Sequence, residues 1–202
     1  MKDKRNDNSG YTLVELIIVI AIIAILSGVG ILTVGSIRTS QATTSMQRFD
    51  EELSALVGKT RSYEGNYAIK LVRNGANYDI YYGTYSGDDS AATADPSKFT
   101  RLDSSATKPD AVLQRVTIYY SADYDADSVT TELGAGDDGD ESKGWVIRVR
   151  KSDNRVIFGS GEYRFVKYNS SDGTVGRIDF SKETGSHTYA KAKATTGGVT
   201  GE

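Results

Sequence analysis

The chain of 202 residues has no cysteine and a single histidine, His187. The lack of cysteine excludes disulfides, thiolate metal sites and a cysteine nucleophile. One histidine excludes a metal centre built on several imidazoles and makes any Ser/His/Asp triad depend on His187 alone. That residue has no nucleophile or acid at a motif spacing, and neither a glycine-rich phosphate loop nor a G-x-S-x-G motif occurs. The sequence therefore predicts no catalytic residue and no enzymatic activity.

The chain also has no excess of basic residues. Lysine and arginine together number 24 against 27 aspartates and glutamates, which gives a formal net charge of −3. Proteins that bind nucleic acid through a broad surface rely on an excess of basic residues to neutralise phosphates. We therefore predict no nucleic-acid partner.

One long apolar run lies near the N-terminus, from Leu16 to Gly35, and reads LIIVIAIIAILSGVGILTVG. As a helix its twenty residues extend about 30 Å, the thickness of the hydrocarbon core of a bilayer. This match predicts a transmembrane helix. Lys2, Lys4 and Arg5 precede the run, and such a cation bias keeps the N-terminus in the cytoplasm and places the rest of the chain outside.

A cleaved secretory signal peptide is the alternative interpretation of this N-terminus. Signal peptides also combine a basic start with an apolar stretch, but their apolar region is shorter and ends in a small-x-small cleavage site. The nearest approach to such a site is the stretch Ser27 to Gly30. The length of the run favours the transmembrane helix.

Glu15 lies immediately before this run, within the otherwise largely apolar stretch from Tyr11 to Ile18. An ionised carboxylate within a spanning helix costs on the order of 2.5 to 3.5 kcal/mol at the centre and less near an end, which marks it as a functional candidate. No lysine, arginine or histidine lies between Tyr11 and Ile37. A cut after Gly10 would give Tyr11 a new α-amino group, and the amine of one subunit could neutralise Glu15 of its neighbour. The alternative is an acidic residue without function near the end of a signal anchor.

The segment Gly10-Tyr-Thr-Leu-Val-Glu15 followed by an apolar helix resembles the signature of type IV prepilins and type II secretion pseudopilins. In that family a membrane-bound aspartic prepilin peptidase cuts after the glycine and methylates the new N-terminal amine. The resemblance implies that a leader of residues 1–10 is removed, that Tyr11 is N-methylated and that Glu15 acts in filament assembly.

The chain departs from the family pattern at two positions. Tyr11 stands where phenylalanine is the commoner first residue of the mature chain, and Leu32 stands where many members have a proline. Glycine weakens a helix interior by about 1 kcal/mol, so Gly28, Gly30 and Gly35 could supply the flexibility that proline gives elsewhere.

After the apolar run the pattern changes to an amphipathic helix. Six apolar residues recur at helical spacing on one face, which predicts a stem that packs against the outer domain. They are Ala42, Met46, Phe49, Leu53, Leu56 and Val57. The predicted organisation is a leader at 1–10, a transmembrane and assembly helix at 11–37, a stem helix at 38–65 and a β-rich globular head at 66–202.

Period-two patterns and turn residues predict strands throughout the head. They fall at Tyr67–Arg73, Tyr78–Tyr82, Val112–Tyr120, Gly144–Arg150, Arg155–Phe158, Tyr163–Tyr168, Gly176–Phe180 and Thr188–Ala194. The predicted fold class is α+β, with the long N-terminal helix packed on one mostly antiparallel sheet of six to eight strands, as in a pilin-like head. The spacing over Asn169–Phe180 and Thr195–Gly198 is similar to heads of minor pseudopilins and fimbrial minor pilins of the H type.

Two long loops are predicted, at 86–109 and 123–142, and the second holds two acidic groups. Asp123-x-Asp125-x-Asp127 and the stretch Asp137 to Glu141 could offer oxygen ligands to calcium. Neither fits the EF-hand loop, so a solvated acidic loop is preferred and no metal site or other cofactor is predicted.

The thirteen tyrosines of the chain also allow two interpretations, a ligand-binding one and a structural one. They could stack sugars or single-stranded nucleic acid, but tyrosine is also a good strand residue, and packing within the sheet is preferred.

The function implied by the resemblance is that of a structural subunit, major or minor, of a type IV pilus or a type II secretion-like pseudopilus. Its implied partners are other pilin or pseudopilin subunits, a prepilin peptidase, an assembly ATPase, a membrane platform protein and, before assembly, membrane lipid. The precursor would sit in the cytoplasmic membrane with its head outside and later in a surface filament or pseudopilus. The alternatives are a signal-anchored domain that binds a ligand through its tyrosine-rich sheet without polymerising, and an anchored hydrolase that uses His187.

Overall fold

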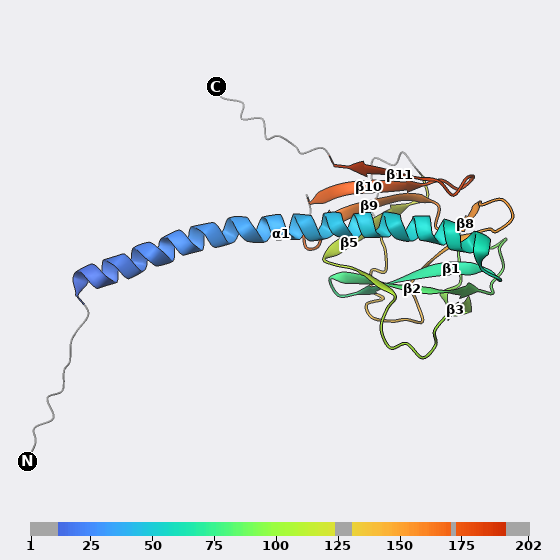
Figure 1. The fold of residues 1–202 in the computed structure, drawn as a ribbon, viewed down its shortest axis with the longest axis horizontal. Helices are drawn as coiled ribbons and strands as arrows, with labels where there is room; N and C mark the ends of the chain where they lie inside the picture. The colour runs from blue at the N-terminus through green and yellow to red at the C-terminus, as the bar shows by residue number, and fades with distance from the viewer. Residues whose placement is uncertain (1–11, 124–130, 171–172, 193–202) are drawn as a thin grey trace, which may run out of the picture. The chain divides into compact units, whose positions relative to one another are not determined.

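The computed structural model describes residues 12–123, 131–170 and 173–192, with the side chains of 26–34 outside that description (Figure 1). The chain divides into two compact units, residues 1–37 and 38–202. Helix α1 covers Leu13–Ser62. Its last turn carries Lys59 and Arg61, cations that the negative end of the helix dipole favours. The helix passes through Gly58, and Gly65 then turns the chain with a φ of 118°.

Strands and one short 3-10 helix make up the rest of the described head. In chain order they are β1 (Tyr67–Asn74), β2 (Asn77–Tyr85), η1 (Pro96–Lys98), β3 (Phe99–Arg101), β4 (Ala111–Leu113), β5 (Val116–Ser121), β6 (Thr131–Glu132), β7 (Trp145–Val149), β8 (Val156–Phe158), β9 (Gly161–Lys167), β10 (Thr174–Phe180) and β11 (His187–Lys191). The α+β class and the antiparallel pairing are confirmed. Strands β3 and β6 lie inside the two segments predicted as loops, so that part of the prediction was incomplete.

The strands form two sheets, and the prediction of one sheet was wrong. The first has the order β3-β2-β1-β7-β8 with β4 also paired to β2, and the second has the order β11-β10-β9-β5-β6. The predicted strand Val112–Tyr120 is broken at Arg115, whose φ is 48°. A left-handed residue cannot continue a strand, so β4 stays with β2 while β5 crosses to pair with β9.

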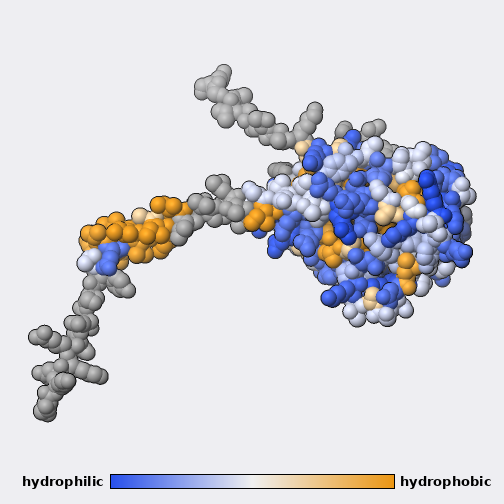
Figure 2. Space-filling model, viewed as in Figure 1, coloured by the Kyte–Doolittle hydropathy of each residue, from blue (hydrophilic) through white to orange (hydrophobic). Residues whose placement is uncertain are grey.

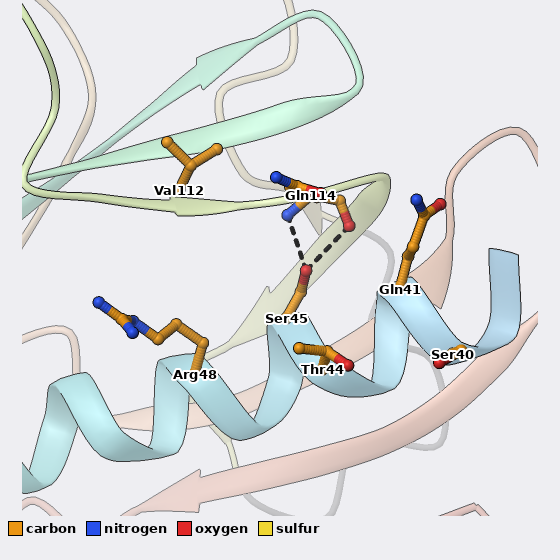
Figure 3. A pocket seen from close by; sticks show the side chains of 7 residues that line it. All are labelled: Ser40, Gln41, Thr44, Ser45, Arg48, Val112 and Gln114. Atoms are coloured by element: carbon orange, nitrogen blue, oxygen red, sulfur yellow. Dashed lines mark hydrogen bonds between the residues drawn. The ribbon is translucent and has the colours of Figure 1, made fainter. Parts of the chain in front are cut away.

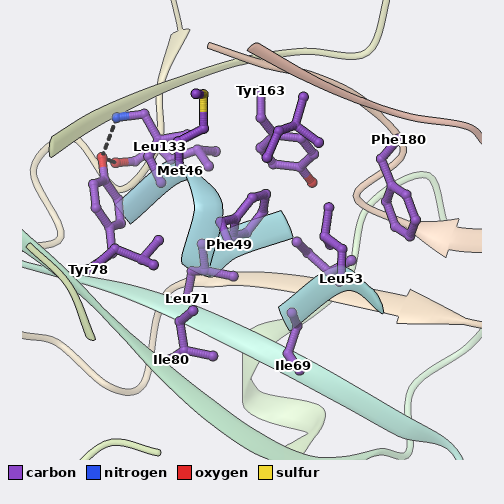
Figure 4. Packing of buried hydrophobic residues seen from close by; sticks show 14 of the residues in the cluster. Met46, Phe49, Leu53, Ile69, Leu71, Tyr78, Ile80, Leu133, Tyr163 and Phe180 are labelled. Carbon is purple, nitrogen blue, oxygen red and sulfur yellow. Dashed lines mark hydrogen bonds between the residues drawn. The ribbon is translucent and has the colours of Figure 1, made fainter. Parts of the chain in front are cut away.

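The stem part of α1 packs between the two sheets. The predicted apolar stripe is confirmed, since Ala42, Met46, Phe49, Leu53 and Leu56 have no exposed surface. The ring of Phe49 lies 5.0 Å from that of Tyr163 and 5.5 Å from that of Phe165, centroid to centroid, both on β9. Figure 4 shows Ile69, Leu71 and Ile80 of the first sheet on the opposite side of Phe49. The helix is therefore the centre of the head's hydrophobic core.

Polar contacts also join the stem to the first sheet. The Tyr82 hydroxyl donates to Glu52 Oε2 at 2.6 Å, and Arg48 Nε donates to Glu52 Oε1 at 3.0 Å. The Lys59 ammonium lies 4.0 Å from the centroid of the Tyr82 ring, which adds a cation–π contact. Glu52 is 4% exposed, and these partners satisfy a carboxylate that burial would otherwise destabilise.

Tyr78 makes the head sensitive to alkaline pH. Burial raises the pKa of Tyr78 to about 12 from its ordinary 10.0. Its hydroxyl donates to the Leu133 carbonyl at 2.9 Å and accepts from the Ile118 N–H at 3.3 Å. A pKa that is higher in the folded than in the unfolded state gives stability that is complete below pH 10 and is lost as the pH rises toward 12.

We therefore expect the unfolding midpoint of the chain to fall steeply between pH 10 and 12, because ionised tyrosine is tolerated only in the unfolded chain. Thermal unfolding followed by circular dichroism across this range measures the slope. Tyr78→Phe should make the slope shallower, while lowering stability at neutral pH because two backbone groups lose their partner. An unchanged midpoint up to pH 12 would contradict the burial of this hydroxyl.

Candidate processing and assembly site

Thr12 and Glu15 cap the N-terminus of helix α1. The Thr12 hydroxyl accepts a hydrogen bond from the Glu15 N–H at 3.2 Å, and Glu15 Oε2 accepts from the Thr12 N–H at 3.2 Å. The same Oε2 accepts from the Thr12 hydroxyl at 3.2 Å. This reciprocal pair is a capping box, which satisfies two N–H groups that a helix leaves unpaired at its start. The carboxylate also lies at the positive end of the helix dipole, where negative charge is favoured.

The capping box gives Glu15 partners that were not predicted from the sequence. The prediction considered only a cation as the partner of the carboxylate, whereas the donors found are uncharged and lie three residues upstream. The signal was present, because threonine followed three residues later by glutamate before an apolar run is a recognisable start of a helix. Gly10 and Tyr11, the predicted cleavage and methylation positions, lie outside the described residues.

The apolar side chains that follow Glu15 are exposed around the helix. Every large apolar residue described between Leu13 and Ile25 has more than half of its surface exposed, from 51% at Ile22 to 75% at Leu13. Figure 2 shows hydrophobic residues covering the visible face of this part of α1. A helix that is apolar on all sides needs lipid or other protein to cover it. Within the portion of the chain that the structure describes, no helix meets the length and hydropathy expected of a membrane span.

The fold places His187 beside two polar residues of α1 that lie far from it in the sequence. Its Nε2 lies 3.2 Å from Ser54 Oγ and 3.2 Å from Asp50 Oδ1. In a catalytic triad the serine and the acid occupy opposite nitrogens of the ring. Here both groups share Nε2, and Nδ1 is buried without a hydrogen bond. The cluster joins β11 to the stem and does not have the geometry of a triad.

The acidic residues of the second group, Asp137 to Glu141, each have a separate partner. Asp137 pairs with Lys143, Asp138 accepts from the Gly75 N–H, Asp140 accepts from the Ser142 N–H, and Glu141 accepts from the Tyr81 hydroxyl. Among the residues covered by the structure, no three acidic or histidine side chains gather as a metal site would require. Asp125 and Asp127 of the other acidic group lie outside the described residues, so calcium binding there stays a hypothesis.

Most tyrosines of strand β2 are buried in the packing of the head, as predicted from the sequence. Tyr78, Tyr81 and Tyr85 are at most 4% exposed, so their ring faces are not available to stack a sugar or a base. A polar hollow of about 300 Å³ lies beside the stem (Figure 3), but the Ser45 hydroxyl at its edge is already bonded to the N–H and carbonyl of Gln114. The remaining lining residues are Ser40, Gln41, Thr44, Arg48 and Val112. This set offers no nucleophile with an adjacent base.

Comparison with known families places the N-terminal segment in a defined class. Residues 5–31 match the family model of the prokaryotic N-terminal methylation motif, which is the signature of type IV prepilins and pseudopilins. The match covers Gly10, Tyr11 and Glu15, and it confirms the prepilin-type signature predicted from those residues. It supports a type IV pilin-like or pseudopilin-like precursor, a structural type of subunit. No curated protein and no solved structure matches the chain.

Proposed function

We propose that this chain is a structural subunit of a type IV pilus or of a type II secretion-like pseudopilus. A prepilin peptidase removes residues 1–10 and methylates the amine of Tyr11, and the mature chain polymerises through its N-terminal helix. The observation that carries this proposal is the methylation motif over residues 5–31. The exposed apolar residues that follow Glu15 on α1 support it, because they need a partner surface that the single chain lacks.

Before assembly, residues 16–35 hold the precursor in the cytoplasmic membrane with the head outside. On assembly these helices leave the bilayer and pack against each other at the filament centre. Lipid is as apolar as leucine, so this transfer brings little net hydrophobic gain, and packing and polar contacts must set the register. Extraction therefore needs an assembly ATPase and a membrane platform protein to drive it.

In the filament, Glu15 pairs with the Tyr11 amine of a neighbouring subunit. Both capping bonds accepted by the carboxylate end on Oε2, and among the residues described no bond reaches Oε1. A carboxylate has room for about four hydrogen bonds, so the neighbour's amine can be added without breaking the cap. A charge-assisted bond of this kind is roughly twice as strong as a neutral one, which suits a contact that fixes register.

Fractionation of cells tests the proposal. Filaments sheared from the surface, or pseudopili enriched from cells that overproduce the apparatus, are probed with an antibody against the head. We expect the mature chain in the filament fraction and the precursor in the membrane fraction, with the filament signal lost when the assembly ATPase is deleted. A chain that stays entirely in the membrane, with the ATPase present or absent, would instead support the non-polymerising surface domain.

A further inference from the structure

A small polar hollow lies at the junction of α1 with two loops of the head. Its volume is about 80 Å³, and it is lined by Arg38, Arg115, Tyr168 and Asn169. Arg38 is a residue of α1, Arg115 stands at the break between β4 and β5, and the other two follow β9. Three segments distant in sequence thus bring two arginines to the lining of one hollow.

Arg38 and Arg115 are exposed residues, and they differ from the other described arginines in their partners. Within the ranges the structure describes, neither Arg38 nor Arg115 makes a side-chain hydrogen bond or an ion pair. The Arg61 side chain donates to Asn154 Oδ1 at 3.0 Å. The other described arginines have acidic partners, namely Arg48, Arg73, Arg101, Arg148, Arg150, Arg155, Arg164 and Arg177. Two cations that line the same hollow without an acidic partner favour an anion there.

Hydrogen bonds hold the backbone of Arg115 beside the hollow through both its N–H and its carbonyl. The Arg115 N–H donates to Asn77 Oδ1 at 3.0 Å, and the Arg115 carbonyl accepts from the Tyr168 N–H at 3.2 Å. Arg115 and Asn169 both have left-handed backbones, with φ of 48° and 56°. Such conformations persist where the surrounding structure fixes them. The loops that carry the donors are therefore organised before any ligand arrives, which lowers the entropy cost of binding.

The size and chemistry of the hollow fit one oxyanion. Its volume of about 80 Å³ equals that of two or three waters at about 30 Å³ each, far less than the roughly 300 to 1,000 Å³ of sites for whole small molecules. Arginine presents a planar fork of donors that matches phosphate oxygens. The Tyr168 hydroxyl and the Asn169 amide are further donors of the right type.

We infer that this hollow binds the phosphate group of a membrane phospholipid. The inference rests on the membrane retention proposed above for residues 16–35. Arg38 follows Gly35 by three residues, which is about 4.5 Å of helix, and the headgroup layer is about 5 to 7 Å deep on each side of the hydrocarbon. A chain held by that run therefore carries Arg38 at the level of the lipid phosphates, where their local concentration far exceeds that of free phosphate.

Nuclear magnetic resonance of the full chain in neutral detergent micelles tests this site. The probes are a short-chain phosphatidylglycerol and, separately, inorganic phosphate, and the readout is the amide resonances of Arg115, Tyr168 and Asn169. We expect saturable shifts with the lipid at lower concentration than with inorganic phosphate. Replacing Arg38 and Arg115 by glutamine should each weaken lipid binding about tenfold, the effect of losing one charge-assisted hydrogen bond.

A matched double variant separates a built site from general attraction. Arg61→Gln with Arg155→Gln removes the same charge elsewhere on the chain and should leave lipid binding unchanged. The inference would be overturned by the absence of a saturable shift, by equal weakening in the control pair, or by inorganic phosphate binding as tightly as the lipid. Normal lipid binding by Arg38→Gln/Arg115→Gln together with lost filament incorporation would assign the arginines to a contact between subunits, and would also overturn it.

Flotation of the wild-type chain with phospholipid vesicles tests membrane retention separately. Flotation without the arginine-dependent shifts would overturn the phosphate site alone and leave the proposed function standing. A chain that fails to float would overturn the membrane part of the proposed function and this inference together.

Discussion

Glu15→Val is expected to abolish incorporation of this chain into filaments while leaving membrane insertion and leader removal largely intact. The precursor does not need the Tyr11 amine as a partner, because that amine exists only after cleavage. In the filament the valine subunit would leave its neighbour's ammonium group unpaired in an apolar centre, and an uncompensated charge there is costly. Immunodetection of mature and precursor chains in membrane and sheared-filament fractions measures both steps.

The capping box makes a sharper experiment possible, because it separates two roles of the same carboxylate. Glutamine is as suitable as glutamate at the third position of a capping box, so Glu15→Gln retains the cap and loses the charge. Thr12→Val does the reverse. If charge pairing governs assembly, Glu15→Gln should fail as completely as Glu15→Val, whereas Thr12→Val should assemble with a modest loss. Normal filament yield from Glu15→Gln would show that the residue acts only as a helix cap.

Phe49→Ala is expected to lower the free energy of unfolding of the head by about 3 to 5 kcal/mol, the usual cost of removing a fully buried aromatic side chain. The ring of Phe49 has no exposed surface and contacts two aromatic rings of the second sheet. Its truncation opens a cavity where the helix meets both sheets. Denaturant unfolding of the full chain, followed by near-ultraviolet circular dichroism of the head's aromatic residues, measures the loss.

Tyr63→Ala provides the matched control for this variant. Tyr63 follows the last residue of α1, is 37% exposed and packs on Tyr67, so its truncation removes an aromatic ring without opening the core. We expect a cost of about 1 kcal/mol, near the average for single substitutions. Equal losses for the two variants would contradict the central position of the stem between the sheets.

The stem and most strands could be predicted from the sequence because their signals are local. The helical spacing of Met46, Phe49 and Leu53 reports one buried face, and that face is the one that meets the sheets. The β1–β2 hairpin was likewise predictable, because Gly75 takes the left-handed conformation that its tight turn requires.

The division into two sheets could not be predicted in the same way. It depends on Arg115 adopting a positive φ, and arginine has no intrinsic preference for that region. Strands of two or three residues, such as β3 and β6, are too short to show a period of two. The contact of His187 with Asp50 and Ser54 joins the last described strand of the head to the stem, far away in the sequence, so no local pattern could indicate it.

At the N-terminal site the sequence sufficed to predict the prepilin-type signature, which the methylation motif over residues 5–31 confirmed. The role of Glu15 in assembly stays a prediction. The bonding of Glu15 to Thr12 is also encoded locally, because a threonine three residues before a glutamate can form a capping box. The hollow at Arg38 and Arg115 needed the fold, since three separate segments form it.

Intact mass spectrometry of the chain recovered from purified filaments is the decisive test of leader removal and of the pairing of Tyr11 with Glu15. We expect the mass of residues 11–202 with one added methyl group, which fragmentation should place on the amine of Tyr11. A filament chain that still carries residues 1–10 would contradict the account, because no new amine would then exist beside Glu15.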